Sequence, residues 1–553
     1  MAESFDYVIV GAGSAGCVLA GRLSEGGEAS VCLLEAGPPD GAWTIRMPAA
    51  VSINIKGTRY NWRFASEPEA LLGGRRIVHP RGRVLGGSSS LNGMIFVRGH
   101  AYDYDRWARE GAVGWSYADV LPYFRRLGSY AQGANRYRGG EGPVYVQRSQ
   151  VSNPLHEAFL TAGQQAGYPL SEDLNGYQQF GVGLYDKNIR AGKRVSAADA
   201  YLASAGRGQR LTVITGALAD RVRIENGRAC AIEIIREGRR RVIRAEREVI
   251  LSAGAFGSPT ILMRSGVGNP DSLRRLGIEP LCALPGVGRN LQDHLELHIQ
   301  YACREPITLY GDLQPLSRAM IAARWFLTRT GKGATNHYDT GAFLLTEPGA
   351  IHPDVQFHFV PIVYNNAVER RVDSHGYRVH AGPLRSAARG EIALRSADPT
   401  APPVIRPNYL SAERDRFEMR RVVELSREIL SAPAFARYRG PEISPGAAAR
   451  SAADIDAFIY GTADTGYHPA STCAMGVGPA AVVDSLGRVH GLAGLRVVDA
   501  SIMPSIVSGN LHAPVMMMAE KLADAIAGRP PLTVDPAPVY EARAANATAA
   551  RPI

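Results

Sequence analysis

A glycine-rich turn near the N-terminus constrains the fold more than any other feature of this 553-residue chain. The apolar run 5–10 leads into Gly-Ala-Gly-Ser-Ala-Gly at 11–16, and residues 17–23 then show helical apolar spacing. A second apolar run occupies 30–35. A strand, a glycine turn, a helix and a second strand make the βαβ unit that binds a dinucleotide pyrophosphate at its helix N-terminus. These residues therefore predict a Rossmann-like α/β domain.

The spacing inside this unit indicates how it holds its ligand. Gly11 allows a tight turn, Gly13 lets the backbone approach a pyrophosphate, and Gly16 lets the helix pack on the strand. Glu35 ends the second strand, nineteen residues after Gly16. An acidic side chain at this distance hydrogen-bonds the ribose of an adenine dinucleotide. We therefore expect an adenine dinucleotide in this domain.

Two later segments bear on which dinucleotide it is. Residues 81–93 read Arg-Gly-Arg-Val-Leu-Gly-Gly-Ser-Ser-Ser-Leu-Asn-Gly, which is too rich in glycine and serine for a regular element. Their backbone N–H groups and hydroxyls could cradle a phosphate or the edge of an isoalloxazine ring. The small residues within 252–259 also suit a close backbone approach to a cofactor.

The chemistry of the chain is expected near its C-terminal end. His468 and Asn510 lie in polar, turn-rich segments between apolar runs, and such segments present side chains to a cavity. A neutral imidazole can accept a hydroxyl proton near neutral pH. A side-chain amide can donate a hydrogen bond to the alkoxide as its charge develops. The two residues therefore predict a catalytic wall that acts on a hydroxyl group.

The rest of the chain predicts two domains, because 553 residues exceed the size of a single hydrophobic core. Residues 211–251 alternate apolar and polar side chains, with a hairpin turn at 225–227. Residues 296–450 combine alternating strands with a helix over 411–430, which is typical of an antiparallel sheet flanked by helices. The expected fold class is α/β, and α+β overall, with a Rossmann-like domain and a second, antiparallel-sheet domain.

Composition limits the cellular location and the binding partners that we expect. The net charge is +10, but the arginines are spread along the chain and the cluster 239–241 resembles a hairpin turn, so no nucleic-acid partner is expected. Six cysteines without a CxxC pair argue against a zinc site and a disulfide framework, and we expect no metal. Without a signal peptide or an apolar run of about 18 residues, the expected location is cytoplasmic. Peripheral contact with the inner membrane stays open.

Five blocks of the chain, in order, resemble the glucose-methanol-choline (GMC) family of flavin oxidoreductases, and most of all its choline-oxidising bacterial members. The blocks are 11–16, 82–93, 254–268, 468–476 and 499–514, and the likeness runs over residues 5–528. The resemblance implies FAD, a Rossmann-like FAD-binding domain assembled from separate segments, and a sheet-based substrate domain. The implied segments are 1–160, 208–295 and 455–528 for the FAD-binding domain and 161–207 and 296–454 for the substrate domain. The proline-rich and then alanine-rich composition of 529–553 predicts a disordered tail.

The resemblance also assigns roles to individual residues. His468 matches the active-site histidine of the family, and Asn510 matches its partner. Asp499 matches a residue that contacts the flavin side chain, Val222 one whose backbone meets the adenine, and Asn92 one beside the flavin ring. The residues expected to bind FAD are Gly11, Gly13, Ser14, Ala15, Gly16, Glu35, Ala36, Gly87, Ser88, Asn92, Gly93, Val222, Asp499, Ala500 and His512.

Two positions depart from the family pattern. Some members attach FAD covalently through a histidine just before the position of Asn92, but this chain has Leu91, which carries no nucleophilic atom. We therefore predict non-covalent FAD that acid or heat releases intact. The family block His-Pro-x-Gly-Thr has Ser471 in place of its glycine.

The resemblance implies transfer of a hydride from a primary alcohol to flavin N5, and choline or a choline-like alcohol is the expected substrate. Aromatic faces hold quaternary ammonium groups, and Trp62 and Tyr467 are the candidates for this. A neutral alcohol is the alternative substrate. A redox-neutral hydroxynitrile lyase on the same fold, a structural role for FAD and a nicotinamide enzyme are the rival functions. The electron acceptor, which could be oxygen or a quinone, and the oligomeric state stay open.

Overall fold

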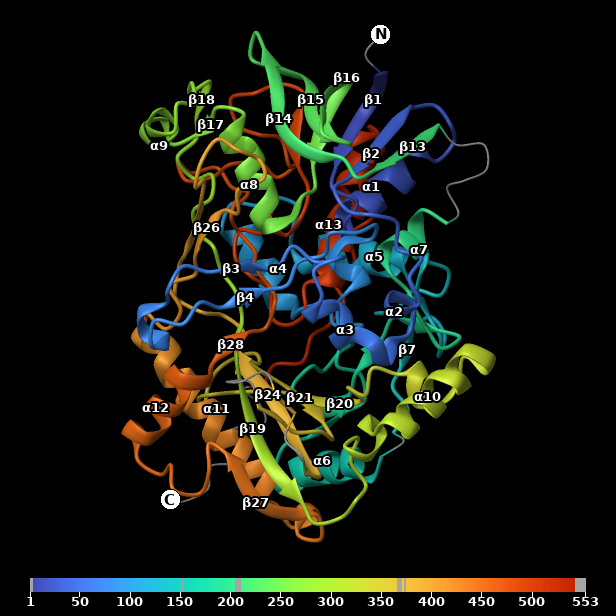
Figure 1. Ribbon diagram of the computed structural model, residues 1–553, viewed down its shortest axis with the longest axis vertical. Coiled ribbons are helices and arrows are strands. Elements are labelled where there is room, and N and C mark those ends of the chain that lie inside the picture. The colour runs from blue at the N-terminus through green and yellow to red at the C-terminus, as the bar shows by residue number, and fades with distance from the viewer. Residues whose placement is uncertain (1–2, 152, 204–209, 366–369, 372–373, 543–553) are drawn as a thin grey trace.

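The computed structural model describes residues 3–151, 153–203, 210–365, 370–371 and 374–542. The chain forms two lobes, one around a mostly parallel sheet and the other around a mostly antiparallel sheet (Figure 1). Each lobe buries its own hydrophobic cluster, and these clusters are called the first and the second core below. The chain crosses between the lobes several times, so each lobe is assembled from separate segments.

The sheet of the first lobe begins with the strands that the glycine turn predicts. β1 (Glu3–Val10) lies between β2 (Val31–Glu35) and β16 (Arg239–Leu251), and β13 (Leu211–Thr215) flanks β2. These four strands are parallel, and β29 (Leu495–Val497) adds to β16 in parallel. All five residues of β2 are buried. Such continuous apolar burial is typical of a parallel sheet with both faces covered.

The other half of this sheet is an antiparallel meander. β14 (Leu218–Glu225) pairs with β15 (Arg228–Arg236), which pairs with β16. The turn between β14 and β15 places Asn226 and Gly227 at φ 50° and 74°, as a two-residue hairpin turn requires. The hairpin expected at 225–227 is therefore confirmed.

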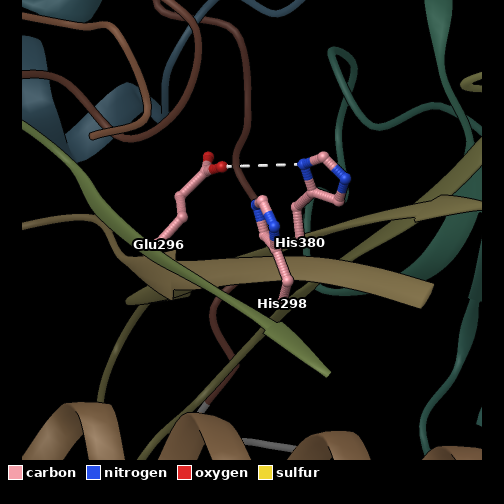
Figure 2. A group of neighbouring side chains, drawn as sticks. All are labelled: Glu296, His298 and His380. Atoms are coloured by element: carbon pink, nitrogen blue, oxygen red, sulfur yellow. Dashed lines mark ion pairs between the residues drawn. The ribbon is translucent and has the colours of Figure 1, made fainter. Parts of the chain in front are cut away.

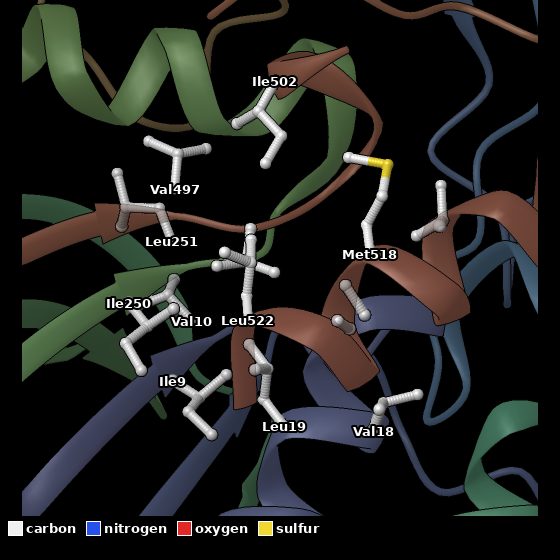
Figure 3. Close-up of a cluster of buried hydrophobic side chains, with 14 of the residues drawn as sticks. Ile9, Val10, Val18, Leu19, Ile250, Leu251, Val497, Ile502, Met518 and Leu522 are labelled. Atoms are coloured by element: carbon white, nitrogen blue, oxygen red, sulfur yellow. The ribbon is translucent and has the colours of Figure 1, made fainter. Parts of the chain in front are cut away.

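Helices pack the first core against this sheet. α1 (Ser14–Ser24) packs on α13 (His512–Ile526), and α8 (Gly254–Arg264) packs near β14. Figure 3 shows how strands and helices far apart in sequence share this core. The labelled side chains are Ile9, Val10, Val18, Leu19, Ile250, Leu251, Val497, Ile502, Met518 and Leu522. A Cβ on Gly16 would lie 1.9 Å from the carbonyl oxygen of Gly11, so glycine is required for this helix to pack so closely.

The second lobe is built on an eight-stranded sheet in the order β27-β19-β24-β21-β20-β9-β8, with β28 paired to β19. β19, β24, β21 and β20 are mutually antiparallel neighbours. Helices α6, α11 and α12 pack around this sheet. The bounds are β27 Arg439–Ser444, β19 Leu295–Cys303, β24 Gly376–Pro383, β21 Val355–Val360, β20 Thr340–Leu344, β9 Gly181–Leu184, β8 Leu170–Ser171, β28 Asp464–Thr465, α6 Pro154–Gln165, α11 Glu413–Ser431 and α12 Ala452–Thr462.

Further helices and short strands complete both lobes. The remaining α-helices are α2 Trp43–Arg46, α3 Val51–Lys56, α4 Ala101–Arg109, α5 Tyr117–Leu127, α7 Ala197–Tyr201, α9 Pro270–Arg275 and α10 Pro315–Thr328. Short strands named in Figure 1 are β3 Phe64–Ala65, β4 Val78–His79, β7 Val144–Arg148, β17 Val267–Gly268, β18 Cys282–Ala283 and β26 Val404–Arg406, the partner of β25 Glu391–Ala393. Among the described residues, no helix combines the length and the apolar character that crossing a lipid bilayer requires.

Several expected domain boundaries do not match the way the chain is shared between the two cores. The boundary at residue 160 falls inside α6, whose Leu155 and Phe159 belong to the second core. α12 also packs into the second core, although it lies mostly within the segment 455–528. Ile392 and Ile405 belong to the first core, although 296–454 was expected in the second lobe. Helical spacing shows that a segment has a buried face, but not which core that face meets.

The expected disorder from residue 529 is corrected for residues 529–542. Asp535 pairs with Arg125 at 2.9 Å, and its N–H donates to the carbonyl of Ala118. Ala537 and Ala542 are buried. Prolines prevent regular structure in this segment but leave it able to lie extended along the surface. Residues 543–553 lie outside the described part of the chain.

Candidate active site

A cavity of about 1800 Å³ lies where the two lobes meet. The glycine turn and α8 line it from the first lobe, and β19, β21 and β24 line it from the second. Small-molecule pockets usually measure about 300–1,000 Å³. The cavity is therefore large enough for an extended cofactor together with a small substrate.

The glycine turn forms one wall of the cavity. Gly11 has φ 102°, and a Cβ there would lie 2.5 Å from the carbonyl oxygen of Ser252. At Gly13 the nearest atom to such a Cβ is 4.0 Å away, so the backbone is open to a ligand. Ser14 and Ala15 begin α1 and also line the cavity. The exposed N–H groups of this helix N-terminus suit a phosphate.

Glu35 and Ala36 continue this wall from the end of β2. The Glu35 carboxylate accepts hydrogen bonds from the N–H of Ala12 at 3.1 Å and of Gly37 at 2.8 Å. Burial raises its pKa to about 7, against the lowering effect of these backbone N–H groups. The carboxylate is thus fixed at the edge of the cavity, where a ribose hydroxyl could reach it.

The second glycine-rich segment lies directly over the first. A Cβ on Gly87 would lie 2.6 Å from the Cα of Gly13, so the two backbones touch. Ser88, Leu91, Asn92 and Gly93 follow along the cavity wall. The Asn92 side-chain oxygen accepts hydrogen bonds from Arg194 at 2.7 Å and from the N–H of Met94 at 3.1 Å. Leu91 is buried, and non-covalent FAD stays a prediction.

Asp499, Ala500 and His512 line the cavity from the C-terminal part of the chain. Asp499 accepts hydrogen bonds from the N–H of Gly254 and the hydroxyl of Ser258, so it connects this segment to the start of α8. His512 contacts the Ser14 hydroxyl through Nδ1 at 3.0 Å. Its Nε2 is buried and has no hydrogen-bond partner among the described residues. A buried polar atom of this kind at a cavity wall is what a bound cofactor would satisfy.

Val222 lies outside the cavity wall, and this expectation is corrected. Its N–H donates to the Ser265 hydroxyl at 2.8 Å, and it pairs with Ile232 across the meander. Leu218 and Ala219, at the start of the same strand, line the cavity instead. Gly16 is also absent from the wall, because it serves the packing of α1. The other residues expected to bind FAD lie at the cavity, and their arrangement fits an adenine-linked flavin.

His468 and Asn510 meet in the same cavity, although 42 residues separate them in the sequence. The Nδ2 of Asn510 lies 3.2 Å from the Nε2 of His468. On the other side of the ring, His468 Nδ1 lies 3.0 Å from the Nδ1 of His294. The side chains of His294, His468 and Asn510 therefore form a row of hydrogen bonds with His468 in the middle. Each hydrogen bond in this row needs one donor and one acceptor.

The tautomer of His468 follows from the end of the row at His294. The Nε2 of His294 lies 3.0 Å from the carbonyl oxygen of Leu384, which can only accept a hydrogen bond. His294 must therefore carry its proton on Nε2, and its Nδ1 is an acceptor. His468 then donates from Nδ1 and keeps a lone pair on Nε2.

The opposite end of the row gives the same assignment independently. The Tyr185 hydroxyl donates to the carbonyl of Phe357 at 2.7 Å, so it accepts from the Gln356 amide at 3.1 Å. Gln356 also donates to the side-chain oxygen of Asn510 at 3.2 Å. This orients the amide N–H of Asn510 toward His468, whose Nε2 must therefore be the acceptor.

Burial, more than nearby charge, keeps His468 neutral. Burial, followed by the nearby His294 and Arg81, lowers its pKa well below the ordinary value. The backbone of the same loop is fixed by the buried Asp293, which accepts a hydrogen bond from the His468 N–H at 2.8 Å and one from the Thr465 hydroxyl at 2.6 Å. A neutral imidazole whose Nε2 lone pair faces the cavity can take a hydroxyl proton when a substrate hydroxyl replaces the Asn510 N–H as its partner.

The structure adds a carboxylate that sequence reasoning did not place in the site. Glu296, on β19, lines the cavity, and a Cβ on Gly466 would lie 3.0 Å from its oxygen. Burial raises its pKa to about 7, and Asp293 and Asp464 add to this. His298, His358 and His380 line the same part of the cavity. The missed signal was the polar side chain at every second position of these strands, which marks a face turned to a cavity.

The two expected substrate residues occupy different surroundings. Tyr467 directly precedes His468, and its φ of 66° is unusual for a residue with a side chain. It lines the cavity near Glu296. Trp62 also lines the cavity, but its ring stacks on Phe64 at 5.6 Å and lies under the Arg83 guanidinium at 4.8 Å. Trp62 already packs with these two side chains, whereas Tyr467 lies beside the proposed reacting groups.

Comparison with known proteins agrees with this architecture. The family models described as GMC oxidoreductase match residues 5–296 and 386–519. The chain is 51% identical to the human mitochondrial choline dehydrogenase over 98% of this chain and 93% of that protein. It is 48% identical to the oxygen-dependent choline dehydrogenase of Paraburkholderia phymatum over 100% and 97%. The crystal structure of pyridoxine 4-oxidase from Mesorbium loti superposes with a TM-score of 0.87 at 33% identity, covering 95% of this chain and 99% of that one.

Proposed function

Because the chain belongs to the GMC oxidoreductase family, we propose that it is an FAD-dependent alcohol dehydrogenase that oxidises choline to the aldehyde. The single observation that carries this proposal is the neutral His468, held with its Nε2 lone pair toward Asn510 at the cavity wall. Near-full-length similarity to choline dehydrogenases supports the choice of substrate.

Different groups act on the hydride, the proton and the developing alkoxide. FAD, when bound, supplies the acceptor for the hydride that leaves the alcohol carbon. His468 Nε2 takes the hydroxyl proton, and the Asn510 amide N–H donates a hydrogen bond to the developing alkoxide. His294, Gln356 and Tyr185 keep these two groups in the required tautomer and orientation. The proton acceptor is therefore ready before any substrate arrives.

Glu296 supports a cationic substrate in preference to a neutral alcohol. A carboxylate attracts the positive charge of a quaternary ammonium, and aromatic faces such as that of Tyr467 add to the attraction. Both residues line the cavity around His468. We therefore assign the ammonium group to the Glu296 side of the cavity and the hydroxyl group to His468.

Anaerobic reduction of the bound flavin tests this proposal. We expect His468→Ala to retain FAD but to slow reduction by choline by about a hundredfold or more, as loss of a general base does. The measurement is the rate of flavin bleaching after rapid mixing with choline under argon. Wild-type rates in this variant would remove His468 from its role. Flavin that no alcohol reduces in the wild type would favour a redox-neutral lyase.

We also propose that α10 contacts the surface of an anionic membrane. Leu316, Met320 and Leu327 share one exposed face of this helix, and Arg318 and Arg324 are its charged residues. Arg318 also lines the edge of the cavity, together with Ala319 and Ala322. An apolar face accompanied by arginine is typical of helices that lie in a membrane interface. Such a contact would bring the cavity close to an acceptor dissolved in the bilayer.

A further inference from the structure

Two histidines and one carboxylate meet on the cavity face of the second sheet. Glu296 and His298 project from β19, and His380 projects from the neighbouring β24 (Figure 2). His298 and His380 are direct partners in the strand register, and their rings lie 4.1 Å apart between centroids. One nitrogen or oxygen atom of each residue lies within 4.8 Å of the others. The three groups therefore face one small volume.

The Glu296 carboxylate faces the imidazole ring of His380 without a hydrogen bond to it. The Glu296 carboxylate is 4.0 Å from the Nδ1 of His380, which is too far for a hydrogen bond. Within the described ranges, no side chain donates a hydrogen bond to this carboxylate. The Nδ1 of His380 faces this carboxylate, whereas its Nε2 lies on the far side of the ring and has no partner among the described residues (Figure 2). Holding a carboxylate partly buried without a bonded partner is unfavourable.

A quaternary ammonium satisfies only part of this arrangement. It can neutralise Glu296, but it has no orbital to accept the lone pair of an imidazole nitrogen. A divalent transition metal ion accepts lone pairs from imidazole and from carboxylate alike. We propose that Glu296, His298 and His380 form a binding site for a divalent transition metal ion of the Zn²⁺ type, open to the cavity on its fourth side.

The geometry requires only small side-chain movements. Ligand atoms around a tetrahedral Zn²⁺ are roughly 3.3 Å apart, given bonds of about 2.0–2.2 Å. The present separations of up to 4.8 Å close to this value when each side chain moves inward by about 1 Å. The ligands come from two adjacent strands whose backbone ladder fixes their spacing. Three protein ligands and an open position are typical of zinc sites that face a substrate cavity.

The metal would compete with a cationic substrate. This consequence rests on the proposed function, because Glu296 is assigned to both the metal and the ammonium group. Binding of the metal itself does not rest on it and can be measured without turnover. The predicted result is an enzyme that Zn²⁺ inhibits competitively with choline and that a chelator restores.

The experiment titrates untagged, FAD-loaded enzyme with ZnCl₂ alone in a calorimeter. We expect one Zn²⁺ per chain in the wild type. His298→Gln and, separately, His380→Gln should each weaken binding by about tenfold or more. His375→Gln is the matched control, because this histidine precedes β24, contacts Thr308 and lies away from the cavity wall. It should bind Zn²⁺ as the wild type does.

Retention of FAD and of Tm shows that each variant is folded. Should a variant unfold, electron paramagnetic resonance of the wild type loaded with Cu²⁺ still tests whether the two histidines bind the metal. Two imidazole ligands give nitrogen hyperfine coupling in this spectrum. Unchanged Zn²⁺ affinity in both variants, or a Cu²⁺ spectrum with oxygen ligands alone, would overturn the site. Zn²⁺ binding without flavin reduction by choline would remove the proposed function and leave the site. Flavin reduction by choline without Zn²⁺ binding would remove the metal site and leave the proposed function.

Discussion

Backbone strain flanks the proposed proton acceptor, because Tyr467 and Ser471 have φ angles of 66° and 73° on either side of His468. Side chains are rarely tolerated in this left-handed region, where glycine is the usual residue. Ser471 stands where the family pattern has glycine, so the conformation explains that pattern. Its hydroxyl is buried and has no partner among the described residues.

Replacing Ser471 by glycine should therefore stabilise the protein. Relief of the left-handed strain and of the unsatisfied hydroxyl outweighs the added freedom of glycine in the unfolded chain, by about 1 kcal/mol. A higher denaturation midpoint in Ser471→Gly would show this. Ser501→Gly is the matched control, because Ser501 also buries an unpartnered hydroxyl but lies in a 3-10 helix without a positive φ. It should lower the midpoint, and a decrease for both would contradict the strain argument.

The pH dependence of the reaction should report Glu296 and not His468. The pKa of Glu296 is raised to about 7, so the carboxyl is neutral below this pH and charged above it. The pKa of His468 lies well below its ordinary value, so its imidazole is already neutral throughout this range. Hence kcat/KM for choline should rise with pH up to about 7 and then level off.

An uncharged isostere of choline supplies the control. For 3,3-dimethyl-1-butanol, which has no charge to attract, kcat/KM should stay flat through pH 7. In Glu296→Gln the rise with choline should disappear. The same inflection for both alcohols would show that another group controls the acid limb.

At the scale of elements, the packing of α13 on its neighbouring helices depends on one buried carboxylate. Glu520 is fully buried and accepts hydrogen bonds from Arg22 on α1 at 3.0 Å, from Arg126 on α5 at 2.8 Å and from the Tyr201 hydroxyl at 2.6 Å. It therefore joins α13 to three other helices. Since His512 begins α13 and lines the cavity, this carboxylate also helps to position the cofactor wall.

Glu520→Gln should destabilise the protein by about 3 kcal/mol, because Arg22 loses its buried carboxylate partner and Arg126 keeps only Asp524. The denaturation midpoint and the amount of FAD retained should both fall. Glu424→Gln is the control, since Glu424 pairs with Arg421 on an exposed helix face and contributes little. Equal decreases in the denaturation midpoint of the two variants would contradict this role of Glu520.

At the scale of the whole molecule, the cavity opens beside α10, which has an exposed apolar face. Leu327 is 83% exposed and Leu316 is 73% exposed. Neither side chain is needed to pack α10 on its lobe, where Trp325 is buried. We expect the protein to sediment with vesicles of anionic phospholipid, and Leu327→Glu to weaken this binding about tenfold, as loss of one buried leucine side chain predicts.

Val477→Glu provides the matched control for this prediction. Val477 is 85% exposed and belongs to a loop beside Gly111, outside α10. Both variants replace an exposed aliphatic side chain by a carboxylate and change the net charge equally, so they differ chiefly in position. Equal loss of vesicle binding in both would mean that net charge, and not α10, controls the contact.

Local patterns in the sequence were enough for the elements that depend on near neighbours. The turn at 11–16 determined β1, α1 and β2, because positive φ angles and close backbone packing need glycine at fixed spacing. The polar turns around His468 and Asn510 pointed to a cavity, and both residues line it. Family resemblance added the roles that these residues are expected to have.

Tertiary structure alone decided which distant residues meet. His294 lies 174 residues before His468, and Gln356 lies 154 before Asn510, yet their side chains set the tautomer of the proposed base. Val222 was misplaced, since its N–H bonds Ser265 while Leu218 and Ala219 line the cavity, and sequence alone does not tell which backbone atoms of β14 reach the cavity. Backbone preferences act within a few residues. Contacts across the sheets depend on how both lobes fold together, and this brought Glu296 into the site.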